Sequence, residues 1–146
     1  MLKDIYSIDE VAVMTGLTTR TIRNYLNKGI ISGEKVDGKW VFTIDNFVEM
    51  LENPYVAPAI RAKNNAPVFD FIKSDKKTCN SMCMIIDRCA SNDEALSLTD
   101  NICRMLEEYN GVDFRFEKKD DNVRIILTGV EEQVKRIYSE ISNEYT

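Results

Sequence analysis

The sequence predicts an α+β protein with a small helical N-terminal unit, a linker and a C-terminal β-α-β-β-α sandwich. The N-terminal unit is predicted by two short helical patterns separated by a glycine, and by an Asp-Gly turn between two extended runs. The C-terminal unit is predicted by strand-like alternation around long helical patterns. With 44% hydrophobic and 29% charged residues, the 146-residue chain has the composition of a folded protein.

The three prolines, Pro54, Pro58 and Pro67, all lie in one stretch and mark the boundary between the units. Proline ends helices and biases the preceding residue toward extended conformations. We therefore expect units over residues 1–53 and 68–146, joined by a linker over 54–67. Units of this size have modest cores, so mutual packing or dimerisation is expected to help them.

The first unit begins with the capping-box sequence Ser7-Ile8-Asp9-Glu10, which predicts a helix that starts after Ser7. Gly16 predicts the end of this helix after about two turns. Thr18 is an N-cap candidate for a second helix over residues 19–28, and Gly29 suits the position after its end. Two short helices joined by a tight turn indicate a helix-turn-helix.

The second helix presents a polar face opposite its apolar residues. The polar positions, at i, i+3, i+4 and i+7, are Arg20, Arg23, Asn24 and Asn27. Arginine can bind guanine or phosphate with two hydrogen bonds, and asparagine can pair with adenine edges. The hydroxyls of Thr18 and Thr19 can bind a phosphate at the helix N-terminus, where the dipole favours anions. A solvated face without a ligand is the alternative interpretation.

The Asp37-Gly38 pair between two extended runs predicts a β-hairpin over residues 34–42, because both residues tolerate positive φ. A hairpin directly after such a helix is typical of a wing. Lys35 and Lys39 lie near its tip, where they can reach phosphates. We expect Trp40 to pack against the helices rather than along a sugar backbone. A third helix, capped by Thr43, is expected to close the core.

Positive charge is concentrated on the second helix and the wing. Residues 18–41 contain five basic and two acidic residues, a net charge of +3, whereas the whole chain carries −5. The basic residues are Arg20, Arg23, Lys28, Lys35 and Lys39. So few cations predict weak and salt-sensitive DNA binding by a monomer, and a homodimer would double the basic surface.

Four runs, Tyr6 to Ala12, Thr15 to Thr18, Arg20 to Tyr25 and Lys28 to Ile31, resemble the winged helix-turn-helix of MerR-type regulators and excisionase-type proteins. The resemblance covers about residues 5–52. MerR-type proteins place two aromatic residues and an acid where Asn24, Tyr25 and Leu26 stand. This departure, and the short wing that leads directly into a helix, favour the excisionase branch.

The resemblance implies a set of residues that face DNA: Arg20, Thr21, Arg23 and Asn24. It also implies that Tyr25 touches a backbone phosphate and that Lys39 belongs to the wing. The long C-terminal dimerising helix that is common in MerR-type regulators is not evident in this sequence.

The sequence of the second unit predicts its fold but says little about its function. A continuous apolar run over Met82 to Ile86 predicts a central strand, and a long helix is expected to start after Ser91. Strands follow over residues 112–117 and 123–127, and a last helix follows Gly129. The residues from Val68 to Ile72 are a candidate first strand. This order resembles most of a ferredoxin-like fold, and we expect a second copy or a ligand to cover the open face of its sheet.

Several function classes are disfavoured. The chain contains no histidine, which removes His-based catalysis and His-ligated metal sites. Its glycines form no phosphate-binding loop, and its paired acidic residues stand at predicted helix ends or turns. We therefore expect no enzyme activity and no cofactor. The sequence shows neither an apolar stretch long enough for a membrane span nor an export signal, so a cytoplasmic protein is expected.

The cysteines are Cys79, Cys83, Cys89 and Cys103. Reduced thiols are the favoured interpretation, and a four-thiolate zinc site is the alternative. Cys79 and Cys83 are close to the spacing of a zinc-binding pair, but the other two form no second pair. We expect no metal site.

The sequence thus predicts a sequence-specific DNA-binding transcriptional regulator. Helix 19–28 would read the major groove of double-stranded DNA, and wing 34–42 would bind its backbone. The second unit would serve self-association or sensing of a small-molecule effector, and a homodimer would read half-sites about 34 Å apart. The alternatives are a protein-interaction adaptor that uses the helix-turn-helix to bind a partner, and an excisionase-like DNA-bending factor.

Overall fold

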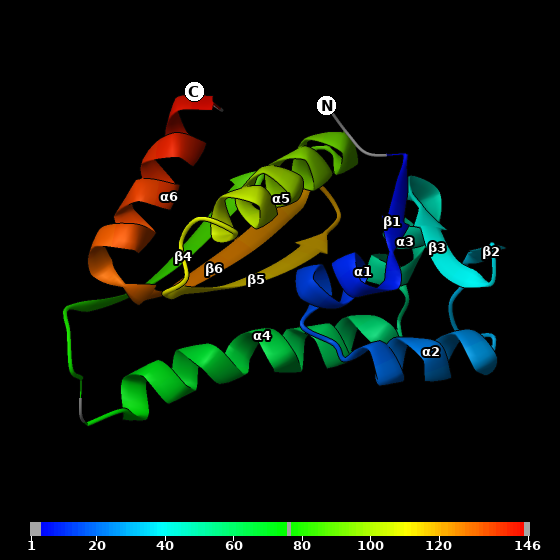
Figure 1. The fold of residues 1–146 in the computed structure, drawn as a ribbon, viewed down its shortest axis with the longest axis horizontal. Coiled ribbons are helices and arrows are strands. Elements are labelled where there is room, and N and C mark those ends of the chain that lie inside the picture. Colours follow the sequence, from blue (N-terminus) through cyan, green and yellow to red (C-terminus); the bar gives the residue numbers. More distant parts are fainter. Residues whose placement is uncertain (1–3, 76, 145–146) are drawn as a thin grey trace.

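The computed structural model describes residues 4–75 and 77–144, which form two sheets with helices around them (Figure 1). The elements are β1 (Ile5–Ser7), α1 (Ile8–Thr15), α2 (Thr19–Asn27), β2 (Glu34–Val36), β3 (Lys39–Thr43), α3 (Ile44–Glu52), α4 (Val56–Lys73), β4 (Ser81–Cys89), α5 (Asn92–Leu106), β5 (Val112–Lys119), β6 (Asn122–Val130) and α6 (Glu131–Glu144). Both sheets are antiparallel, with strand orders β1-β3-β2 and β4-β6-β5.

The local signals of the first unit are confirmed. Ser7 and Glu10 form a reciprocal capping box at the start of α1, and Gly16 ends that helix with a left-handed φ of 77°. Thr18 caps α2, and Thr43 caps α3. One element was missed: β1 pairs with β3 and turns the hairpin into a three-stranded sheet. Three residues are too few for a strand pattern to be read from the sequence.

Most of the stretch expected as a linker, residues 54–67, is helical, because α4 runs continuously from Val56 to Lys73. Pro58 stands in its first turn, where the missing N–H has no intrahelical partner to lose. Pro67 is inside the helix and removes one backbone hydrogen bond. Packing of one face offsets this cost: Ile60 and Asn64 are buried, and the Asn64 amide donates to the Phe116 carbonyl at 2.9 Å.

The second unit has the predicted β-α-β-β-α order, with two corrections. Residues 68–72 belong to α4 rather than to a strand, and β4 is an edge strand. The central strand is β6, which pairs along its length with both neighbours. An apolar run with Met and Ile on both faces is typical of a central strand. In β4, however, one face is only partly covered, and Ile85 is 52% exposed.

The sheet β4-β6-β5 lies between two helical layers (Figure 1). One face packs on α5 and α6 through side chains such as Phe116, Ile125 and Ile102, all of which are buried. On the opposite face, α4 lies against β5 and β6. The expectation that a second copy or a ligand covers this face is therefore wrong where α4 runs, because the chain's own helix fills the position.

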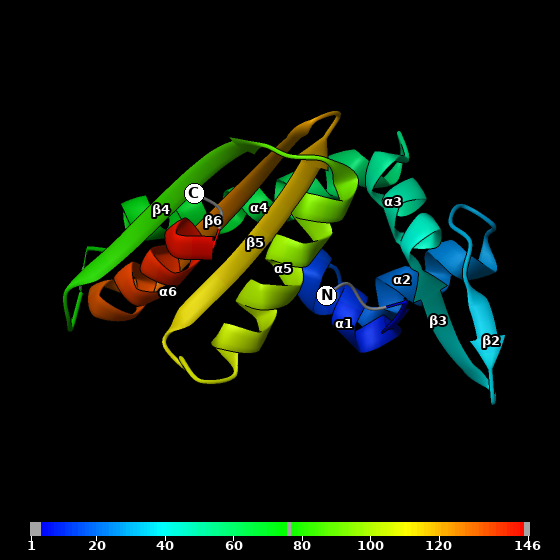
Figure 2. The same ribbon diagram turned by 90° about the horizontal axis from the view of Figure 1, so that it is seen from above.

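The first unit is docked on the second rather than tethered to it (Figure 2). Helix α1 contacts β5 and α5, and α3 contacts β5. The buried Tyr6 hydroxyl donates to the Asp100 carboxylate of α5 at 3.1 Å. Among the described residues, no helix is long and apolar enough to cross a membrane.

Candidate nucleic-acid interface

Helix α2 begins at a side-chain cap that leaves its N-terminus at the surface. The Thr18 hydroxyl oxygen accepts the Thr21 backbone N–H at 3.1 Å, and the two hydroxyls lie 2.9 Å apart. Thr18 is exposed and Thr19 and Thr21 are half-buried. The helix dipole and the unpaired N–H groups of this turn favour an anion such as a phosphate.

The polar face of α2 is exposed as the spacing predicted. Its exposed residues are Arg20, Arg23, Asn24 and Asn27, and Lys28, directly after the helix, is exposed as well. On the opposite face Ile22 and Leu26 are buried and anchor the helix in the core of the first unit. The Arg23 guanidinium donates to the Thr19 hydroxyl at 3.5 Å, which lays the arginine along the N-terminal turn. The helix therefore presents two guanidinium groups and two amides on one surface.

Tyr25 lies at the edge of this surface rather than fully on it. It is half-buried and meets the Tyr55 ring edge-on, with ring centroids 5.9 Å apart. Burial, followed by the nearby Tyr55, raises the pKa of the Tyr25 phenol. A protonated phenol can donate a hydrogen bond, and the resemblance implies that Tyr25 touches a backbone phosphate.

The β2–β3 hairpin turns at Asp37 and Gly38, whose φ angles are 52° and 78°. These positive values are those of the predicted two-residue turn. Trp40 is half-buried against the core, as expected. The Lys35 ammonium lies 5.0 Å from the centroid of the Trp40 ring. Lys39 is exposed on the opposite strand. The hairpin thus offers two cations near its tip.

Two basic residues near the turn between α1 and α2 were missed by the sequence reasoning. A Cβ at Gly16 would lie 3.3 Å from the Arg115 Cδ and 3.5 Å from the Lys63 Cβ. Lys63 comes from α4 and Arg115 from β5, so only the docking of the two units brings them here. No sequence pattern links them to Gly16.

The cysteines do not converge. Cys79 is exposed, Cys83 and Cys89 lie on β4, and Cys103 lies on α5. Within the described part of the chain, no group of three or more Cys, Asp or Glu side chains is placed to hold a metal ion.

These features define the class: a helix-turn-helix with an exposed, basic second helix, which is the geometry of a DNA-binding domain. Residues 5–54 match the family described as "Helix-turn-helix domain". This stretch, about a third of the chain, is a helix-turn-helix DNA-binding domain of excisionase type. Neither the search of curated proteins nor the search of solved structures found a match.

Proposed function

We propose that this protein is a sequence-specific transcriptional regulator of the cytoplasm that binds double-stranded DNA without catalysis. Helix α2 enters the major groove, and the β2–β3 hairpin acts as a wing against the phosphate backbone. The observation that carries the proposal is the exposed set Arg20, Arg23 and Asn24, which stands on a helix whose other face is buried.

The electrostatics support a local and salt-sensitive interaction. Each phosphate contact releases counterions, so affinity falls steeply as salt is raised. Arg23 and Asn24 would contact bases, because bidentate groups at mid-helix distinguish base pairs in the major groove. Thr18, Lys35 and Lys39 would contact phosphates, which fixes the register of the helix.

A homodimer belongs to this proposal, and β4 is the edge that supports it. In the described chain this nine-residue strand pairs only with β6, so one row of its backbone groups faces outward. Exposed edges of this kind pair readily with another strand. A second copy of β4 in antiparallel orientation, centred on Ile85, would bring Met84 opposite Ile86. We further propose that the second unit is ferredoxin-like. A further strand of that fold would pair with the free edge of β4.

A DNA-bending role is the second candidate, because the family match is of excisionase type. In that case α2 and the wing would still bind a duplex, and the outcome would be a bent complex rather than control of transcription. Measurement of the bend angle of a bound fragment, by its gel mobility as the site is moved along it, separates the two roles.

The first test is selection of bound genomic DNA fragments by the purified protein beside Arg23→Ala. Lys73→Ala is the matched control, since Lys73 is an exposed cation at the far end of α4. We expect a discrete motif that Arg23→Ala loses and Lys73→Ala retains, with a loss of affinity of roughly tenfold or more for one bidentate contact. A paired motif would support the homodimer. If no motif is enriched even at low salt, the protein-interaction adaptor becomes the better explanation.

A further inference from the structure

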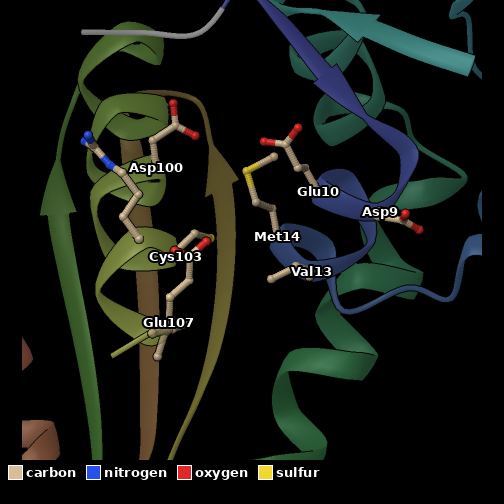
Figure 3. A pocket seen from close by; sticks show the side chains of 9 residues that line it. Asp9, Glu10, Val13, Met14, Asp100, Cys103 and Glu107 are labelled. Atoms are coloured by element: carbon tan, nitrogen blue, oxygen red, sulfur yellow. The ribbon is translucent and has the colours of Figure 1, made fainter. Parts of the chain in front are cut away.

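A cleft of about 440 Å³ lies between α1 and α5 (Figure 3). It opens where the first helix of the helix-turn-helix meets the second unit. Pockets that bind small molecules have volumes of roughly 300–1,000 Å³ and occur preferentially between domains. The cleft therefore has both the size and the place of a ligand site.

The walls of the cleft are mainly apolar. Val13 and Met14 come from α1, and Cys103 and Leu106 come from α5. Val13 is 55% exposed although it stands at the junction of two packed units. In Figure 3 both Val13 and Met14 extend from α1 toward α5. An apolar group placed here would cover surface that the fold leaves in contact with water.

The charges around this apolar wall are predominantly negative. The lining contains four carboxylates, Asp9, Glu10, Asp100 and Glu107, and one cation, Arg104. Some of these groups also serve the fold. Glu10 accepts the Ser7 backbone N–H, Asp100 accepts the Tyr6 hydroxyl, and the Arg104 guanidinium donates to the Asn101 side chain. Glu10 and Asp100 face each other across the cleft, and Glu107 directly follows the end of α5 (Figure 3).

We propose that this cleft binds a small organic cation, a protonated amine with an apolar body, and that this ligand regulates DNA binding. The apolar body would contact Val13, Met14 and Leu106. The ammonium group would lie near the carboxylates of Glu107 and Glu10. An anionic ligand would meet like charge, and a neutral one would leave the electrostatic attraction unused.

The position of the cleft explains how such a ligand would act. It would contact α1 and α5 together and so stabilise the docked arrangement of the first unit. In that arrangement the Lys63 and Arg115 side chains pass beside Gly16, in the turn that precedes α2, so a docked first unit holds this turn in one position relative to α4 and β5. The ligand should therefore raise DNA affinity, and typical coupling between two sites is roughly 5- to 150-fold. This regulatory part rests on the proposed DNA-binding function, whereas ligand binding itself does not.

The ligand test uses three probes of one shape and different charge: 4-phenylbutylamine, 4-phenylbutanol and 4-phenylbutyrate. Isothermal titration of the full chain is expected to give saturable 1:1 binding of the amine. We expect binding at least tenfold weaker for the alcohol and none for the acid. Equal binding of all three, or no saturation by the amine, would overturn the proposal.

Two adjacent carboxylates provide the matched variants. Both side chains are exposed, but Glu107 lines the cleft and Glu108 does not. Glu107→Gln should weaken amine binding at least fivefold, and Glu108→Gln should leave it unchanged. Similar effects of the two substitutions would indicate nonspecific attraction to an acidic surface and would contradict the proposal.

The regulatory part is tested by fluorescence anisotropy on the selected DNA motif, with and without saturating 4-phenylbutylamine. An increase in affinity of fivefold or more supports it. An unchanged affinity, with the amine bound, overturns it. If the protein binds no DNA at all, the proposed function has failed, but titration with the amine still tests the cleft by itself.

Discussion

At the residue scale, Thr18 has a structural role that is established and a DNA-binding role that is proposed. Its hydroxyl caps α2 by accepting the Thr21 N–H. Thr18→Ala should lower the free energy of unfolding by about 1 kcal/mol, the usual cost of losing a cap. Thr18→Asp should keep the cap and its stability but weaken DNA binding, because a carboxylate would repel a phosphate. Urea unfolding and DNA anisotropy measure the two effects, and undiminished DNA binding by Thr18→Asp would contradict the phosphate contact.

Tyr6 gives the protein a predictable dependence on alkaline pH. Burial, followed by the charge of Asp100, raises the pKa of its phenol well above the ordinary value of 10.0. Above pH of about 10 the unfolded chain loses this proton while the folded chain keeps it. Stability is therefore fully present below that pH and falls as the pH rises further.

Tyr6→Phe should flatten this decline between pH 9 and 11, because it removes the titrating group. At pH 7 the variant should be less stable by about 1 kcal/mol, since it also loses the hydrogen bond to Asp100. Urea unfolding at a series of pH values measures both effects. Parallel pH profiles of the variant and the parent would show that other groups cause the decline.

At the scale of elements, the end of β6 depends on one glycine. Gly129 has a φ of 155°, and a Cβ there would lie 1.8 Å from the Gly111 carbonyl oxygen. Gly129→Ala must displace backbone and should cost about 3 kcal/mol or more of unfolding free energy. Gly38→Ala is the control, because Gly38 also has a positive φ but has nothing within 4 Å of an added Cβ. Equal losses would indicate that backbone strain alone, without the clash, sets the cost.

At the scale of the whole molecule, the docking of the two units predicts a single cooperative unfolding transition. Trp40 is the single tryptophan of the chain and reports on the first unit, whereas far-UV circular dichroism reports on both units. The two signals should give coincident urea transitions, because α1 and α4 pack against β5. A fluorescence transition at lower urea would mean that the first unit unfolds independently.

Short-range signals account for what the sequence predicted correctly. Ser7, Thr18 and Thr43 are caps, and Asp37-Gly38 is a turn, so each is specified by residues next to it in the chain. The exposed face of α2 follows from the same kind of evidence, because a period of 3.6 residues assigns Arg20, Arg23 and Asn24 to one side. These three residues belong to the candidate DNA-binding surface.

The stretch with the prolines shows where such reasoning fails. Pro67 favours a break in the helix, but the buried faces of Ile60 and Asn64 hold α4 together against the second sheet. A hydrogen bond from Asn64 to a strand far along the chain has no counterpart in the local sequence. Tertiary packing of α4 therefore outweighed the local preference of proline for a helix break.

By itself, the sequence determined the helix-turn-helix, its exposed basic helix, the turn of the hairpin and the order of elements in the second unit. Each of these depends on a hydrophobic period, a helix cap or a turn pair that lies within about a dozen residues. Only the tertiary structure decided that α4 is a helix, that β4 stands at an edge, that Lys63 and Arg115 flank the turn, and that a cleft opens between α1 and α5. Those features join residues distant in the chain, and their free energy comes from burial that no local pattern encodes.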